Sequence, residues 1–292
     1  MNYKILTSII VFALSSAVHG VEVGQLVQGT IAINGRAERN IYATFPLVEG
    51  EWSVEYSKLR SNSSNSDFRD LNFFQFENGK LKLAAEYIIK VGGSGTQWLD
   101  EPCKVQPTLH KNDYGTRIWK QKCLVIEAIP FLQSNNEPTR LALNSLSKRG
   151  MKNDFNSLRM TYTRYGDSDK FMIVRLHFFP SVYGLENPTV GIINTSPWNP
   201  SNIPSDPGKT RFVNALIKYS ERLVQSLDLA YETGNASAPI AKFSYPDEVD
   251  SSKATIELPS KEVRLRDLKG MFEKNLITKE IYEAQQNKIL NN

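Results

Sequence analysis

The stretch FFQFENGKLKLAAEYII, residues 73–89, decides the fold class of this chain. Apolar residues recur at every second position from Leu81 to Ile89, which is the spacing of a β-strand with one buried face. The dipeptide Asn78-Gly79 precedes that strand and is the strongest short-range signal for a two-residue hairpin turn. The sequence therefore predicts an antiparallel β-hairpin in this region.

Further strands are expected on both sides of this hairpin. Segments 41–45 and 52–56 alternate apolar and polar residues around a turn that contains Gly50, and we expect them to pair with each other. Segments 158–164 and 171–179 flank a polar turn, and the second has apolar residues on both faces, as central strands do. Residues 117–129 are predicted to form another strand, whereas residues 138–157 do not decide between a short helix and a loop.

One long helix is predicted over residues 207–233. Asp206 is a candidate N-cap with Pro207 at the first helical position, and Gly234 is expected to end the helix. Its apolar stripe, which most simply packs on the sheet, contains Val213, Leu216, Ser220, Leu223, Val224 and Leu227. The expected fold class is therefore α+β: a mostly antiparallel β body over residues 21–234 with one long packing helix. Residues 235–259 contain several prolines and are predicted to form a linker.

The last segment, residues 260–292, has the pattern of two short amphipathic helices joined by a tight turn. Asn275 can end the first helix in a left-handed conformation, and Thr278 can cap the second. The apolar residues expected to bind a partner are Leu265, Leu268, Phe272, Ile281, Tyr282 and Ile289.

This segment resembles the bacterial short C-terminal domain, known as SHOCT, whose usual pattern is L-x-x-L-x-x-L-x-x-x-G-x-I-T-x-E-E-F. Asn275 and Leu276 stand where that pattern has its glycine-containing pair, and Lys279-Glu280 stands where an acidic pair is common. The resemblance covers about a tenth of the chain. It implies an accessory helical hairpin associated with assembly, which carries no known chemistry.

Residues 1–20 have the features of a secretory signal peptide. Lys4 is followed by an apolar run over residues 5–14 and by small residues up to Gly20. An uncleaved membrane anchor is the alternative, but the run is shorter than the ~20 residues of a comfortable span. No later segment is apolar enough to span a bilayer, so no transmembrane segment is expected after cleavage. We therefore expect a periplasmic or secreted protein.

The charges of the chain are mixed. Cleavage after Gly20 would remove Lys4 and lower the formal net charge from +4 to +3. The basic residues are scattered among acidic ones, so no nucleic acid is expected as a partner.

Cys103 and Cys123 are the chain's two cysteines. In an oxidising compartment such an isolated pair is expected to form a disulfide, and closing a loop of this length contributes roughly 3 kcal/mol in the chain-entropy model. A redox-active or metal-binding pair is the alternative. Redox pairs usually have the spacing C-x-x-C, and two cysteines make a poor zinc site, so the structural bridge is favoured.

Two short motifs are incomplete versions of known sites. Gly208-Lys209-Thr210 opens a helix as a phosphate-binding loop does, but Ile203 occupies the position of the required first glycine. Ser94 lies in a glycine-rich loop, but Thr96 replaces the second glycine of a nucleophile elbow. A simple helix start and a simple loop are the favoured interpretations.

The remaining candidates are histidines and tryptophans. His110 and His177 are too few for a histidine-rich metal site, although one histidine suffices for a Ser-His-Asp arrangement. Trp98, Trp119 and Trp198 can bind sugars or a partner, but more often such residues close the end of a β-sheet core.

Together these features favour a non-enzymatic envelope protein that binds an envelope partner, or itself, through its C-terminal hairpin. No cofactor and no metal are predicted. A hydrolase with a non-obvious site in a loop cleft, or a glycan- or lipid-binding module that uses the loop tryptophans, are the alternatives. A deep pocket with His110 or His177 beside a serine and a carboxylate would favour the hydrolase.

Overall fold

The structure is a computed structural model of the whole chain. It describes residues 21–34, 41–63, 65–93, 102–104, 108–114, 121–131, 137–151, 156–166, 170–188, 196–236 and 238–245, together with Leu265, Lys269, Tyr282, Glu283, Gln286, Asn287 and Leu290. The chain divides into two compact units, Met1–Pro246, which we call the body, and Asp247–Asn292, the C-terminal unit.

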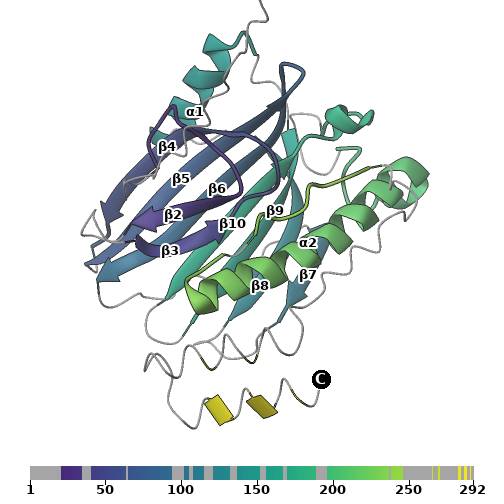
Figure 1. Cartoon of the computed structure of the whole chain (residues 1–292). Coiled ribbons are helices and arrows are strands. Elements are labelled where there is room, and N and C mark those ends of the chain that lie inside the picture. The colour runs from purple at the N-terminus through teal and green to yellow at the C-terminus, as the bar shows by residue number, and fades with distance from the viewer. Residues whose placement is uncertain are drawn as a thin grey trace, which may run out of the picture. The chain divides into compact units, whose positions relative to one another are not determined.

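The described part of the body is built on an eight-stranded antiparallel sheet with the strand order β1-β4-β5-β6-β10-β9-β8-β7 (Figure 1). The strands are β1 (Leu26–Val27), β4 (Trp52–Ser61), β5 (Ser66–Glu77), β6 (Lys80–Gly93), β7 (His110–Asp113), β8 (Lys122–Pro130), β9 (Asn156–Tyr165) and β10 (Phe171–Phe178). A second sheet pairs β2 (Thr30–Asn34) with β3 (Ile41–Pro46). The expected α+β class, with a mostly antiparallel sheet and a long helix, is confirmed.

The hairpin predicted from residues 73–89 is present as β5 and β6. Glu77 pairs with Lys80, and the two residues between them have positive φ angles, 52° for Asn78 and 73° for Gly79. Such angles are those of a turn whose twist matches that of the flanking strands. The hairpin of β9 and β10 is also confirmed, and β10 lies between β6 and β9 as a central strand.

The pairing expected between segments 41–45 and 52–56 is wrong. β3 pairs with β2, and β4 pairs with β5 in the large sheet. Between them, Leu47 and Val48 are buried, and Val48 forms a parallel bridge with Ile240, which follows the long helix. The residues between β3 and β4 therefore carry the chain from the small sheet to the large one. In this arrangement both strands bury their apolar side chains in one shared core.

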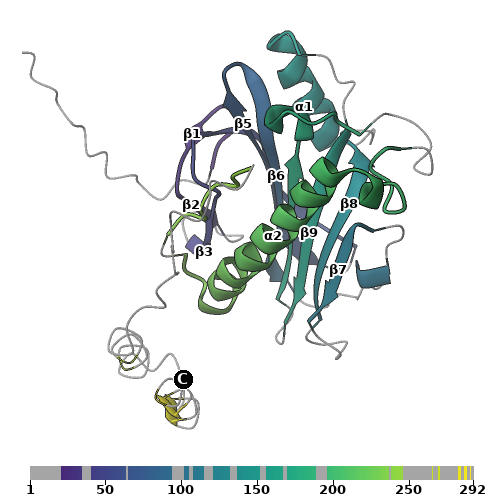
Figure 2. The same cartoon turned by 90° about the vertical axis from the view of Figure 1, so that its right-hand side faces the viewer.

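The long helix is α2 (Pro207–Thr233), and it begins and ends as predicted. The Asp206 side chain accepts hydrogen bonds from the backbone N–H groups of Gly208 and Lys209, and Gly234 ends the helix with φ 69°. Every residue of the predicted stripe is buried. α2 and the β2–β3 sheet lie side by side over the same face of the large sheet (Figures 1 and 2).

Asp228 attaches the last third of α2 to the large sheet. Its carboxylate accepts hydrogen bonds from the Tyr162 hydroxyl of β9 and the Lys122 ammonium of β8. The Arg164 Nε atom lies 3.4 Å from the same carboxylate. This cluster holds the C-terminal turns of α2 at a defined position over the sheet.

The opposite face of the sheet is covered by α1 (Glu137–Lys148) and by the short 3-10 helix η1 (Pro102–Lys104). α1 packs Ala142 and Leu146 against phenylalanines of that face. The predicted disulfide between Cys103 and Cys123 is confirmed, with the Cα atoms 5.7 Å apart, and it fixes η1 on β8.

The body extends further than the sequence indicated. A linker was expected from residue 235, but Ile240 and Phe243 are buried and the compact unit ends at Pro246. Ile240 exchanges backbone hydrogen bonds with Leu47 and Glu49, and the Phe243 ring contacts Phe178, Tyr183, Phe212 and Tyr219. Tyr245 adds to this packing, because its ring lies 4.9 Å from the Phe212 ring and its hydroxyl donates to the Gly208 carbonyl, so apolar side chains hold the segment on the core. The remainder of the expected linker, residues 246–259, lies outside the described residues.

Candidate functional site

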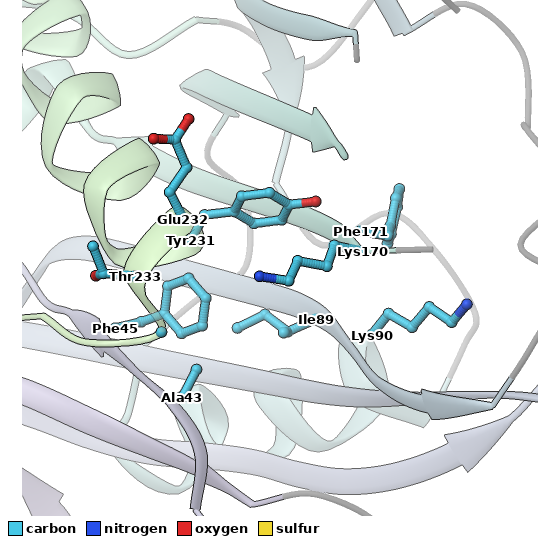
Figure 3. A pocket seen from close by; sticks show the side chains of 10 residues that line it. Ala43, Phe45, Ile89, Lys90, Lys170, Phe171, Tyr231, Glu232 and Thr233 are labelled. Atoms are coloured by element: carbon cyan, nitrogen blue, oxygen red, sulfur yellow. The ribbon is translucent and has the colours of Figure 1, made fainter. Parts of the chain in front are cut away.

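A pocket lies at the C-terminal end of α2, where the helix meets β3, the end of β6 and the start of β10 (Figure 3). Its volume is about 230 Å³. The lining residues come from segments far apart in the sequence: Ala43, Phe45, Ile89, Lys90, Lys170, Phe171, Tyr231, Glu232, Thr233 and Gly234.

The walls of the pocket are mainly apolar. Phe45 of β3, Ile89 of β6, Phe171 of β10 and Tyr231 of α2 are all buried. Ile89 faces the pocket because it continues the alternating inward positions of β6, and Tyr231 follows Leu227 by four residues on the buried stripe of α2. The residues that build the core therefore also form the walls of the pocket.

Charged groups surround this apolar space. The Lys170 ammonium lies 5.9 Å from the centroid of the Tyr231 ring, and its side chain extends between Tyr231 and Ile89 (Figure 3). The ammonium of Lys90 points away from that space in the same view. Glu232 lies 3.4 Å from the Arg164 guanidinium, which also contacts the Tyr231 ring, with its Cζ atom 5.2 Å from the ring centroid. Lys170 is thus the cation whose side chain reaches into the pocket.

The backbone at the end of α2 has its own hydrogen-bond partners. The Ala230 carbonyl accepts from the Gly234 N–H at 2.8 Å, and the Gly234 carbonyl accepts from the Thr44 N–H of β3 at 2.9 Å. The Thr233 hydroxyl donates to the Leu229 carbonyl at 2.7 Å. These carbonyl groups are therefore satisfied without a ligand or a lysine.

Gly166 allows Tyr231 to take its place in the pocket wall. A Cβ atom at position 166 would lie 2.6 Å from the Tyr231 hydroxyl oxygen. Any other residue at that position would therefore displace the tyrosine.

The sequence does not predict this site. Lys170 belongs to the polar turn between segments 158–164 and 171–179, whereas Phe45 and Phe171 belong to predicted strands. No local spacing could have revealed the pocket, because β3, β6, β10 and α2 bring its residues together only in the folded protein.

The histidine-serine pair that a hydrolase would need is present but buried. The Ser157 Oγ and His177 Nδ1 atoms are 2.8 Å apart, on neighbouring strands β9 and β10. Ser157 is 0% exposed, and the Phe131 ring packs on His177 with its centroid 5.0 Å away. Burial, together with Arg159 and Arg175, holds the pKa of His177 well below its usual value. The pair therefore serves as an internal hydrogen bond across the sheet, because a substrate cannot reach the serine.

His110 has a different environment at the sheet edge. Its Nε2 atom lies 3.7 Å from Glu221 of α2, and burial lowers the pKa of His110 while Glu221 opposes that shift. This contact joins β7 to the helix and brings no nucleophile to the histidine.

The other sequence candidates have structural roles where the structure describes them. Lys209 is held by Glu186 at 2.7 Å and Asp206 at 3.2 Å, so Gly208-Lys209-Thr210 is a simple helix start, as favoured. Trp198 is 0% exposed and donates from Nε1 to the Glu186 carbonyl, so it fills the core. Trp98, Trp119 and Ser94 lie outside the described residues.

The C-terminal unit contains the predicted partner-binding residues. Leu265 and Tyr282 are helical and half-buried, whereas Leu268, Phe272, Ile281 and Ile289 lie outside the described residues. Near the chain end, Tyr282 and Gln286 are half-buried while Glu283 and Asn287 are exposed, which is the pattern of an amphipathic helix. Leu290 is 51% exposed. The two-helix hairpin itself stays a prediction.

Among the described residues, no three potential metal ligands gather into one cluster, and none of the helices is both long and apolar enough to cross a membrane. No known protein family matches the chain, and no curated protein or solved structure is significantly similar to it.

Proposed function

We propose that the protein is an exported, non-enzymatic envelope protein that associates with a second copy through its C-terminal unit. The observation that supports this most directly is that residues 247–292 form a compact unit of their own, whose described apolar residues are incompletely buried.

The apolar surface of this unit needs a cover. The two helices predicted there are short, and isolated helices below about 12–15 residues are marginal in water unless an apolar face is packed. Tyr282 and Gln286 mark one face, and Leu290 remains half exposed at the chain end. The resemblance to the SHOCT segment also favours assembly. A second copy supplies an identical apolar face, and another envelope protein is the alternative cover.

Export is part of this proposal. The Cys103–Cys123 disulfide fits an oxidising compartment, where such bonds persist. The signal-peptide pattern of residues 1–20 favours the same destination, periplasmic or secreted.

Two alternatives have less support. A hydrolase needs a reachable nucleophile, and the Ser157–His177 pair is enclosed by the sheet and Phe131. A glycan- or lipid-binding module needs accessible loop tryptophans; of the three candidates, Trp198 is part of the core, and Trp98 and Trp119 lie outside the described residues.

The test compares the molar mass in solution of the mature chain with that of a chain that ends at Pro246. Light scattering coupled to size exclusion should show an oligomer for the first and a monomer for the second. Replacing Leu268 and Phe272 with Asp should have the effect of the truncation. A matched control is the double variant Lys269→Asp with Asn287→Asp, because both of those positions are exposed.

Two results would contradict the proposal. If all variants form particles with the same number of copies as the mature chain, self-association through this unit is wrong, and a different envelope protein must provide the cover. If the chain that ends at Pro246 loses its near-UV circular dichroism, the C-terminal unit is part of the core of the body.

A further inference from the structure

The pocket at the end of α2 combines an apolar interior with the Lys170 ammonium, which extends into it. Phe45, Ile89 and Tyr231 surround the space into which Lys170 extends (Figure 3). Aromatic and aliphatic walls of this kind favour the compact apolar part of a small molecule, and a few placed polar groups determine its orientation.

The charge available to a ligand in this pocket is positive. Glu232 is held 3.4 Å from the Arg164 guanidinium, and Lys90 directs its ammonium elsewhere. Lys170 is exposed, and its ammonium forms no ion pair within the part of the chain that the structure describes; its contact is with the Tyr231 ring. A carboxylate at the mouth of the pocket would gain a charge-assisted hydrogen bond from this ammonium.

A simpler role for Lys170 would be to neutralise the negative end of the α2 dipole. Three carbonyl groups at this end of the helix already have backbone or hydroxyl donors: Gly234 for Ala230, Thr44 for Gly234, and Thr233 for Leu229. The side chain is also directed between Tyr231 and Ile89 (Figure 3). The position of Lys170 is therefore that of a ligand-binding cation more than that of a helix cap.

The pocket is also preformed. Tyr231 is fixed between the Arg164 and Lys170 cations, and Gly166 leaves the room that its hydroxyl needs. Asp228, one turn earlier on α2, ties the helix to β8 and β9. A ligand would therefore meet walls that need little rearrangement, which lowers the entropic cost of binding.

We propose that this pocket binds a small organic carboxylate with a compact aromatic or short aliphatic body. The volume of about 230 Å³ is below the range of drug-sized sites, so the ligand should have roughly ten non-hydrogen atoms. This binding is independent of association through the C-terminal unit.

The test uses benzoate as the probe and the full mature chain labelled with ¹⁵N. Titration should shift the backbone resonances of residues that line the pocket, such as Thr233 and Gly234, with a Kd of about 1 mM for a ligand of this size. Benzyl alcohol, which has the ring without the charge, should bind at least about tenfold more weakly. Sulfate, which has the charge without the ring, should leave these resonances unshifted.

Variants locate the site. Lys170→Gln should weaken benzoate binding about tenfold. Lys80→Gln, an exposed lysine at the other end of β6, is the matched control and should leave the Kd unchanged. Ala43→Leu should fill the pocket and abolish the shifts. If that variant loses its fold, Lys170→Gln still decides the question, because position 170 is exposed.

Three results would overturn the proposal. The first is the absence of saturable shifts up to about 20 mM benzoate, roughly twentyfold above the expected Kd. The second is equal binding of benzoate to the Lys170→Gln variant and to the mature chain. The third is equal binding of benzyl alcohol and benzoate, which would show an apolar cavity without selection for an anion.

Discussion

Replacing Asp228 with Asn should destabilise the body by loosening α2 from the sheet. The carboxylate accepts hydrogen bonds from Tyr162 and Lys122 and lies 3.4 Å from Arg164 Nε. Asparagine keeps the shape and one oxygen acceptor, but it removes the negative charge that the two cations surround.

The magnitude follows from the burial of the partners. Removing one member of a buried ion pair costs about 3–5 kcal/mol, because the other member stays buried without a counter-charge. The Asp228 side chain is 18% exposed and asparagine still accepts one hydrogen bond, so we expect a smaller loss of about 2–3 kcal/mol. Burial and Asp228 both raise the pKa of Tyr162, so the hydroxyl donates to the carboxylate.

Equilibrium unfolding in urea, followed by circular dichroism at neutral pH, measures this loss. With an m-value of about 2–3 kcal/mol/M, the midpoint should fall by about 1 M. Glu221→Gln is the matched control, because that side chain is 44% exposed and 3.7 Å from His110, and it should cost less than about 1 kcal/mol. A double-mutant cycle with Tyr162→Phe should give a coupling energy of about 1 kcal/mol. If Asp228→Asn costs no more than Glu221→Gln, the cluster does not attach the helix and our reasoning is wrong.

Four further predictions test other parts of the fold. Replacing both Cys103 and Cys123 with Ser should lower the free energy of unfolding by about 3 kcal/mol, and a reductant should then have no further effect on the urea midpoint. Gly79→Ala should lower the free energy of unfolding, measured by thermal unfolding, by about 1–2 kcal/mol, because Gly79 has φ 73° and a Cβ atom disfavours that left-handed conformation. An unchanged stability would mean that the turn rearranges. Phe243→Ala should cost about 3–5 kcal/mol, whereas a residue in a free linker would cost nothing. The pKa of His177 is lowered in the folded state, so below about pH 6.5 the unfolded state alone binds the proton. The free energy of unfolding should therefore fall as the pH drops below about 6.5, by at most about 1.4 kcal/mol per pH unit. His177→Asn should flatten this pH dependence, and an unchanged curve would assign it to other groups.

The sequence by itself determined the elements whose signals are local. Alternation from Leu81 to Ile89 and the Asn78-Gly79 turn specify the β5–β6 hairpin, because the period of two and the turn geometry act within one short segment. Asp206, Pro207 and Gly234 likewise determine the bounds of α2, because a cap acts on the N–H and C=O groups of its own helix. The disulfide could be predicted from the number of cysteines and the expected oxidising compartment alone.

Strand partners and the end of the body were decided by the tertiary structure. The alternation in segments 41–45 and 52–56 shows that each is a strand with one buried face, but the same pattern is satisfied by any partner that covers that face. β2 and β5 became the partners because the chain crosses between the sheets at Leu47 and Val48. The prolines of residues 235–259 favoured a linker, but Phe243 is buried because aromatic residues from distant parts of the chain, among them Phe212 and Tyr219, pack around it.

The candidate site also depends on tertiary structure alone. Lys170 is an ordinary turn lysine in the sequence, and it becomes part of a pocket only because β3, β6 and α2 bring Phe45, Ile89 and Tyr231 around it. His177 and Ser157 show the reverse case, since their residue types suggested chemistry but the sheet encloses them. Local patterns specify which side of an element is apolar; only the packing of distant elements decides whether that side meets a neighbour, solvent or an empty pocket, because burial is a property of the whole fold.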